Sequence, residues 1–209
     1  MNRSVEKCPR PRGRPRSFCQ ERALDAAVHV FWEKGYDGAS LDDLTRAMGI
    51  GRPSLYGAFG DKRALFLAAL ERYGATVGSC GVVALGEHDD VREAVKAFLE
   101  RVLRAQTDAP GGCLVGGAAS PAIGTIEGVG EAVRGMACQT ETIIRDRFDA
   151  AREAGQLADD FPSRERARML ADFMHAQGHR ARLGETREDL AADIPAKVEA
   201  VLRCDPARD

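Results

Sequence analysis

A short polar segment that follows Gly51 carries side chains suited to hydrogen bonding with a nucleic acid. Arg52, Ser54 and Tyr56 occur close together, interrupted by Pro53 and a leucine. An arginine can bind a guanine through two parallel hydrogen bonds, whereas hydroxyl and ammonium groups usually contact backbone phosphates. These residue types favour recognition of a duplex over catalysis.

Proline and arginine alternate in the basic segment that ends at Arg16. Proline lacks a backbone N–H and biases the preceding residue toward extended conformations, so a helix is not expected here. We interpret residues 1–16 as a flexible basic arm that could follow a narrow minor groove. A solvated tail without a partner is the alternative. The arginines concerned are Arg10, Arg12, Arg14 and Arg16.

Charge is distributed unevenly along the 209 residues, although the net charge is only −2. Residues 1–72 contain 13 lysines and arginines against 9 acidic residues, whereas the remainder contains 17 against 23. A basic N-terminal segment followed by an acidic remainder predicts a local surface that binds a polyanion.

Local signals predict the elements that must position these side chains. Ser40 and Asp43 resemble a capping box at the start of one helix. Pro53 suits the first turn of another, where its missing N–H costs little. The expected helices cover residues 17–35, 40–49 and 53–60, with a fourth beginning after Asp61.

Apolar residues recur at helical spacing through the rest of the chain, and no segment alternates as a strand would. The fold class predicted is therefore all-α. Ser163 is expected to cap one of these helices, and Pro195 predicts a kink or a late start in the last. The expected helices cover residues 91–107, 126–155, 163–184 and 187–202.

The two short helices around Gly49 have the layout of a helix-turn-helix. A major groove admits one helix, which needs a tight turn to hold it at the right angle. Leu44, Met48, Ile50 and Leu55 would pack this pair together. The residues expected to face outward are Arg52, Ser54, Tyr56 and Gly57.

Four motifs follow one another over residues 17–70: FWEKGY at 31–36, SLDDL at 40–44, MGIGRPSLY at 48–56 and F-x-x-K-x-x-L at 59–65. In this order they resemble the N-terminal domain of TetR-family (tetracycline-repressor-like) transcriptional regulators. The resemblance implies an N-terminal helix-turn-helix, three-helix DNA-binding domain at residues 17–62. A larger helical effector-binding and dimerisation domain would follow at residues 63–209.

The function implied is that of a cytoplasmic, homodimeric, sequence-specific regulator without a membrane partner. It would act as a repressor released from double-stranded operator DNA by a small-molecule effector. By motif position, Ser40, Tyr56 and Lys62 would contact phosphates, and residues 52–54 would lie nearest the base edges. The complete set of expected DNA-binding residues is Arg12, Arg14, Arg16, Ser40, Gly51, Arg52, Pro53, Ser54, Tyr56, Gly57 and Lys62.

Each role has an alternative. Tyr56 could belong to the core, Ser40 could serve only as a helix cap, Lys62 could be simply solvated, and Arg52 could contact a phosphate. Gly57 and Ala58 depart from the family, in which larger polar or aromatic residues are common at these positions. Gly57 either permits close approach of the backbone to DNA or is tolerated drift.

The effector pocket is implied by the family, with apolar residues of the second domain as its candidate lining. Ordinary core packing is the alternative for all of them. The residues predicted to bind the ligand are Phe98, Val102, Cys113, Leu114, Met136, Ile144 and Met174.

Cys113 lies in a glycine-rich segment where a short helix could begin, and a helix N-terminus lowers the pKa of a thiol. Two alternatives use this residue: a regulator that responds to oxidants or electrophiles, and an all-α enzyme. A protein that compacts DNA without sequence preference is a further alternative.

No catalytic constellation, cofactor motif or metal site is expected from the sequence. The cysteines have no C-x-x-C spacing, and His175 and His179 lack a third ligand, so they are interpreted as surface or interface groups. The sequence contains no run of about 18 apolar residues, so a membrane span is not expected.

Overall fold

The computed structural model describes residues 19–108 and 112–203, and every regular element within them is helical. The predicted all-α class is confirmed. The elements are α1 (Gln20–Gly38), α2 (Leu41–Met48), α3 (Arg52–Phe59), α4 (Lys62–Tyr73), η1 (Gly74–Gly78), α5 (Cys80–Leu85), α6 (Val91–Thr107), η2 (Leu114–Ala118), η3 (Ser120–Ala122), α7 (Val129–Glu153), α8 (Ser163–Arg182), α9 (Arg187–Ala192) and α10 (Ile194–Leu202).

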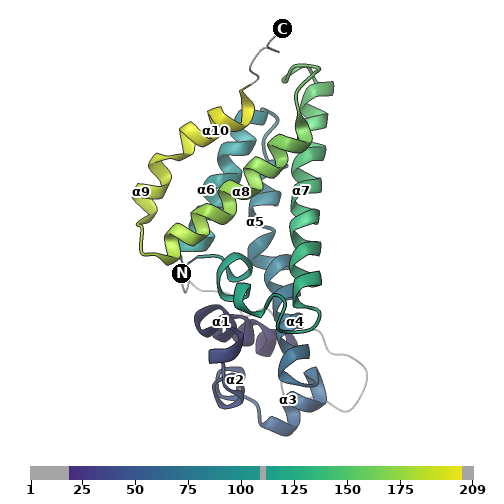
Figure 1. The fold of residues 1–209 in the computed structure, drawn as a ribbon, viewed down its shortest axis with the longest axis vertical. Coiled ribbons are helices and arrows are strands. Elements are labelled where there is room, and N and C mark those ends of the chain that lie inside the picture. The colour runs from purple at the N-terminus through teal and green to yellow at the C-terminus, as the bar shows by residue number, and fades with distance from the viewer. Residues whose placement is uncertain (1–18, 109–111, 204–209) are drawn as a thin grey trace.

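The molecule is elongated, with α1 to α3 at one end and α5 to α10 along the remainder (Figure 1). Helix α4 leads from α3 toward the body, where α7 and α8 lie beside each other. Helix α4 is followed by η1, a single π-helical turn that precedes α5.

Two hydrophobic cores correspond to these two regions. The first is formed mainly by α1 to α4 and contains the buried rings of Phe31, Trp32 and Phe66. It is completed by residues far along the chain, since Leu114 and Ala119 are fully buried in it. The second core joins α5 to α10.

The short helices begin and end as their local signals predict. Ser40 and Asp43 form a capping box at α2, and Gly49 ends that helix in the left-handed conformation with φ 66°. Gly51 precedes α3, whose first turn contains Pro53. Favourable caps and a preset proline φ stabilise these helices before packing contributes.

Three boundaries differ from the predicted ones or refine them. Gly35 adopts φ 70° and breaks the helical backbone inside α1, which then continues to Gly38. The helix predicted over residues 187–202 is broken at Asp193 into α9 and α10, and Pro195 lies in the first turn of α10. The cap predicted at Ser163 is wrong, because this residue begins α8 and makes no side-chain capping bond.

Five apolar residues of the last helices are predicted from the sequence to form a dimer seam: Leu170, Met174, Ile194, Val198 and Val201. All of them except Met174 are at most 4% exposed in the single chain and fill the protomer's own core, so those four are wrong as seam residues. Met174 is half-buried.

Candidate DNA interface

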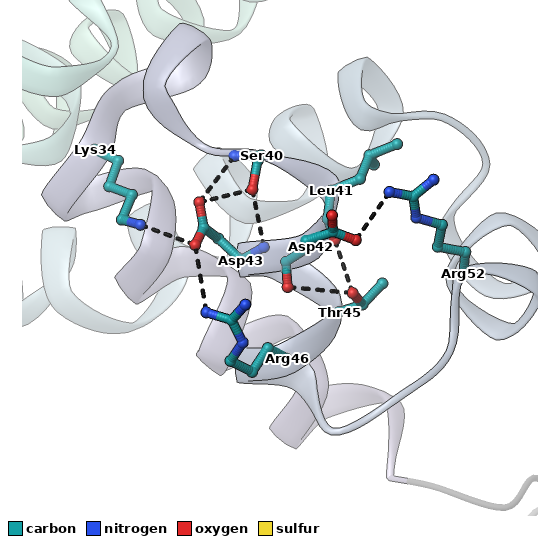
Figure 2. Close-up of polar contacts among 8 residues, drawn as sticks. All are labelled: Lys34, Ser40, Leu41, Asp42, Asp43, Thr45, Arg46 and Arg52. Carbon is teal, nitrogen blue, oxygen red and sulfur yellow. Dashed lines mark hydrogen bonds and ion pairs between the residues drawn. The ribbon is translucent and has the colours of Figure 1, made fainter.

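The start of α2 is held by a network centred on the Asp43 carboxylate (Figure 2). The Ser40 hydroxyl donates to Asp43 Oδ2 at 2.7 Å and accepts from the Asp43 amide at 3.0 Å. Lys34 Nζ lies 3.0 Å from Oδ1. The Ser40 side chain, followed by Lys34, lowers the pKa of Asp43 to about 2.

Arg52 at the start of α3 is paired with Asp42 on α2. A guanidinium nitrogen of Arg52 donates to Asp42 Oδ1 at 2.8 Å, and both side chains are more than half exposed (Figure 2). The hydrogen bond from Arg52 to Asp42 raises the pKa of the guanidinium. The pair joins the two helices across their turn while keeping the cationic group at the surface.

Helix α3 is anchored by one side and exposed on the other. Leu55 is fully buried, whereas Tyr56 is 49% exposed, which excludes a core role for the tyrosine. Gly51, Arg52, Pro53 and Gly57 are also exposed, and Ser54 is half-buried. The outward face predicted from the sequence is therefore present.

Lys62 begins α4 next to this exposed face. Its ammonium lies 4.5 Å from the centroid of the Tyr36 ring, a favourable cation–π arrangement. The ring itself stacks on Phe31 and tilts against Phe66, so its orientation is set by the first core. Lys62 is consequently positioned by an aromatic surface.

Gly57 has open space on its side-chain side. A Cβ at this position would meet no atom of the described chain within 4 Å. Internal packing therefore does not require glycine here. The predicted contacts of Arg12, Arg14 and Arg16 lie outside the described residues.

Sequence reasoning did not assign Lys34, Tyr36 or Asp42 to this surface. Each acts through a neighbour: Lys34 on Asp43, Tyr36 on Lys62, and Asp42 on Arg52. All three lie within the quoted motifs, but the pairings depend on how α1, α2 and α3 pack.

The body contains a cavity of about 560 Å³ between α4, α6, α7 and α8, close to the first core. Val102, Cys113, Met136 and Met174 line it. Its remaining lining includes the polar residues Gln106, Gln139, Thr140 and His175.

Phe98, Leu114 and Ile144 do not line this cavity. All three are fully buried, and core packing accounts for their positions. His175 also differs from its interpretation as a surface group, because it lines the cavity and its Nδ1 and Cys113 Sγ lie within 4 Å of the same point beside Gly116.

Four contacts connect the region of the cavity wall with the first core. The ring of Tyr73 lies edge-on against Trp32, with centroids 5.1 Å apart, and its hydroxyl donates to Cys113 Sγ at 3.6 Å. Trp32 donates to the Gly112 carbonyl at 3.2 Å. Arg182, at the end of α8, donates to the Trp32 carbonyl at 3.1 Å.

Residues 19–108 and 112–203 contain neither a candidate metal site nor a candidate membrane span. No group of three or more histidine, cysteine or acidic side chains is arranged to hold a metal ion. None of the helices there combines the length and the apolar character that a bilayer crossing requires.

Comparison with known proteins supplies the family. The sequence model described as "Bacterial regulatory proteins, tetR family" matches residues 23–69. The HTH-type transcriptional repressor BdcR of Escherichia coli is 31% identical over 208 residues, covering 94% of this chain and 96% of BdcR. The chain belongs to the TetR family. It is a helix-turn-helix transcriptional regulator.

Two further TetR-type regulators are similar to this chain. The repressor ComR of E. coli is 35% identical over 115 residues, which is 54% of this chain and 55% of ComR. A cysteine mutant of the TetR family regulator CifR, solved with 26-base-pair double-stranded operator DNA, is 35% identical with a TM-score of 0.83. That alignment covers 90% of this chain and 99% of CifR.

Proposed function

We propose that the chain is a cytoplasmic, homodimeric repressor that binds operator DNA through α3 and is released by a small-molecule effector. The observation that carries this proposal is the two-sided character of α3. Leu55 anchors the helix, whereas Arg52 and Tyr56 are exposed. BdcR and ComR are named as repressors, and CifR is bound to operator DNA.

The proposed division has an arm at 1–16, a DNA-binding domain at 17–62 and an effector and dimerisation domain at 63–209. Ser40, Tyr56 and Lys62 contact phosphates, and Arg52, Pro53 and Ser54 lie against base edges. Gly51 and Gly57 let the backbone approach the DNA. Two copies of α3 would enter successive major grooves about 34–36 Å apart.

The proposed effector site is the cavity lined by Val102, Met136 and Met174. An effector must bind the DNA-free conformation more tightly, and a coupling of about 1–3 kcal/mol gives a 5–150-fold loss of DNA affinity. Tyr73, which lines the cavity, packs against Trp32 in the first core, and Arg182, at the end of α8, donates to the Trp32 carbonyl. They are the contacts through which we expect the change to reach α1.

The test is a fluorescence-anisotropy titration with the DNA upstream of the protein's own gene and an unrelated duplex as control. Arg52→Ala is expected to weaken specific binding about 5–150-fold, corresponding to the 1–3 kcal/mol of a good base contact. Arg164→Ala removes an exposed arginine from α8 and is expected to leave binding unchanged. Equal affinity of the wild type for both duplexes would contradict sequence-specific recognition.

A further inference from the structure

Cys113 is surrounded by hydrogen-bonding groups at the edge of the cavity. It precedes η2, where its Sγ accepts from the Gly116 amide at 3.4 Å and from the Tyr73 hydroxyl at 3.6 Å. His175 on α8 faces the same point. Its Nδ1 and the Sγ of Cys113 lie 3.4 and 3.9 Å from the position that a Cβ on Gly116 would occupy.

The electrostatics of this cluster favour a thiolate. Burial raises the pKa of the Cys113 thiol, but His175, the Gly116 amide and Tyr73 together outweigh burial, so the pKa lies below its ordinary value. The interaction with Cys113 raises the pKa of His175 despite partial burial. Asp172 and Glu141 act on the imidazole in the same direction.

Gln106 supplies a second, independent feature of the same cavity. The residue is only 3% exposed, and its Nε2 donates to the Met174 carbonyl at 3.0 Å. Its Oε1 is buried and has no hydrogen-bond partner among the described residues. An unsatisfied buried acceptor is costly, and a ligand that brings a donor would remove that cost.

The remaining lining is mostly apolar. Val102, Val115, Val133, Met136 and Ile143 face the same space. A fitting ligand therefore has an aliphatic body and a hydroxyl for Gln106. The group that such a ligand places next to Cys113 would lie beside a soft sulfur nucleophile.

We propose that Cys113 captures the effector covalently, and that the effector is an aliphatic α,β-unsaturated aldehyde or ketone carrying a hydroxyl group. The regulatory part rests on the proposed function, because the adduct is expected to lower affinity for operator DNA. The capture itself does not depend on DNA.

The reaction is a conjugate addition that needs no oxidant or reductant. His175 holds the proton taken from the Cys113 thiol. The thiolate attacks the β-carbon and forms a C–S bond, while the π electrons of the C=C bond move toward the carbonyl as an enolate. The His175 imidazolium then returns the proton to the α-carbon, which leaves a thioether and a neutral imidazole.

An adduct at this position would disturb a contact with the DNA-binding region. The Tyr73 hydroxyl donates to Cys113 Sγ, and its ring packs on Trp32. Alkylated sulfur is bulkier and carries no negative charge, so this hydrogen bond weakens. The weakened hydrogen bond would alter the packing of Tyr73 on α4 against Trp32 on α1.

The experiment treats the full-length protein with limiting 4-hydroxy-2-nonenal and maps adducts by peptide mass spectrometry over time. Cys113 is expected to react at least about tenfold faster than the exposed Cys138 of the same molecule, although it is buried. His175→Gln is expected to slow the Cys113 reaction by at least about tenfold, because the amide cannot take the proton from the thiol. Nonanal, which lacks the double bond, should give no thioether.

Three results would overturn the proposal. One is a Cys113 reaction no faster than that of Cys138 in the wild type, a comparison that needs no variant. Another is a wild-type rate in His175→Gln. The third is a preference for 4-hydroxy-2-nonenal over 2-nonenal that persists in Gln106→Met.

DNA binding is measured separately on the same samples. Treated wild type and Cys138→Ser are expected to lose affinity for the upstream duplex at least about fivefold, the lower bound of typical coupling, whereas Cys113→Ser should not respond. Modified Cys113 with unchanged DNA affinity would overturn its regulatory role. Failure of the untreated wild type to bind DNA would instead refute the proposed function and leave the labelling result intact.

Discussion

The Arg52 guanidinium is held 2.8 Å from the Asp42 carboxylate, on the exposed side of the helix-turn-helix (Figure 2). The carboxylate repels DNA phosphates and engages the arginine proposed to read bases. Exposed pairs contribute only about 0.2–1 kcal/mol, so DNA can displace this one.

Asp42→Asn is therefore expected to raise DNA affinity about two- to fivefold at low salt, because it frees Arg52 and removes a negative charge. Anisotropy titrations at several salt concentrations measure this. Asp160→Asn, at an exposed turn of the body, is the matched control and should leave affinity unchanged. Weaker binding of Asp42→Asn would show instead that the carboxylate orients Arg52 productively.

The capping box predicts a specific acid dependence of stability. The pKa of Asp43 lies at about 2, below its ordinary value of 3.8. A depressed pKa means that the carboxylate stabilises the folded state fully above the unfolded-state value, and that this contribution is lost as pH falls from about 4 through 2. Asp43→Asn should lower the Tm at pH 7, and the difference from wild type should shrink toward pH 3.

Thermal melts followed by circular dichroism at pH 7, 5 and 3 measure this difference. Asp160→Asn should show no comparable convergence, since Asp160 lies at an exposed turn of the body and takes no part in the capping box. A Tm difference that is constant down to pH 3 would contradict the role of the ionised cap.

Gly57→Ala should increase stability and decrease DNA binding. Alanine in a helix is favoured by about 1 kcal/mol over glycine, and the added methyl group meets no atom of the chain. The same methyl would stand on the exposed side of α3, between the backbone and DNA. Gly135→Ala on α7 also meets open space, so it should give the stability gain without the loss of binding. Unchanged DNA affinity in Gly57→Ala would show that glycine at this position is tolerated drift and is not needed for close approach of the backbone to DNA.

Gly178 permits close contact between α8 and the cavity wall. A Cβ there would lie 2.8 Å from Gln106 Nε2 and 2.9 Å from Cys113 Cβ. Gly178→Ala is expected to lower the free energy of unfolding by about 1–3 kcal/mol through overpacking, measured by urea denaturation. Gly135→Ala, which meets open space, is expected to raise the free energy of unfolding under the same conditions. A stabilised Gly178→Ala would show that α8 can move away at no cost.

Deletion of residues 1–16 tests the basic arm. Each phosphate contact that is lost reduces the slope of log K against log salt by about 0.9. We expect weaker binding and a slope reduced by about 2–3, since the arm carries several arginines. An unchanged slope would exclude contacts between the arm and DNA.

The helix-turn-helix could be predicted because its signals are local. The Ser40 side chain accepts from the backbone amide three positions later and so caps α2. Gly49 ends α2 in the left-handed conformation, and Pro53 presets the backbone of the first turn of α3. Each of these effects acts within one or two turns of chain. Tyr56 faces outward because it directly follows Leu55 on the same helix, and Leu55 faces the core.

The cavity could not be predicted in the same way because it depends on long-range packing. Val102 and Leu114 have similar apolar character, yet only Val102 lines the cavity. Gln106 and His175 were missed because their roles arise where α6 and α8 meet around Gly178. Helical periodicity identifies a buried face without distinguishing core from cavity wall.

The first core is not made from one continuous stretch of sequence. Residues 113–122 pack against α1 and α4, and Leu114 and Ala119 are fully enclosed there. A chimera that transplanted only residues 19–73 onto another regulator's body would leave Trp32 and Tyr73 without their native cover. Exchange of DNA-reading modules between such proteins would have to transfer both segments together, so the two would be expected to co-evolve.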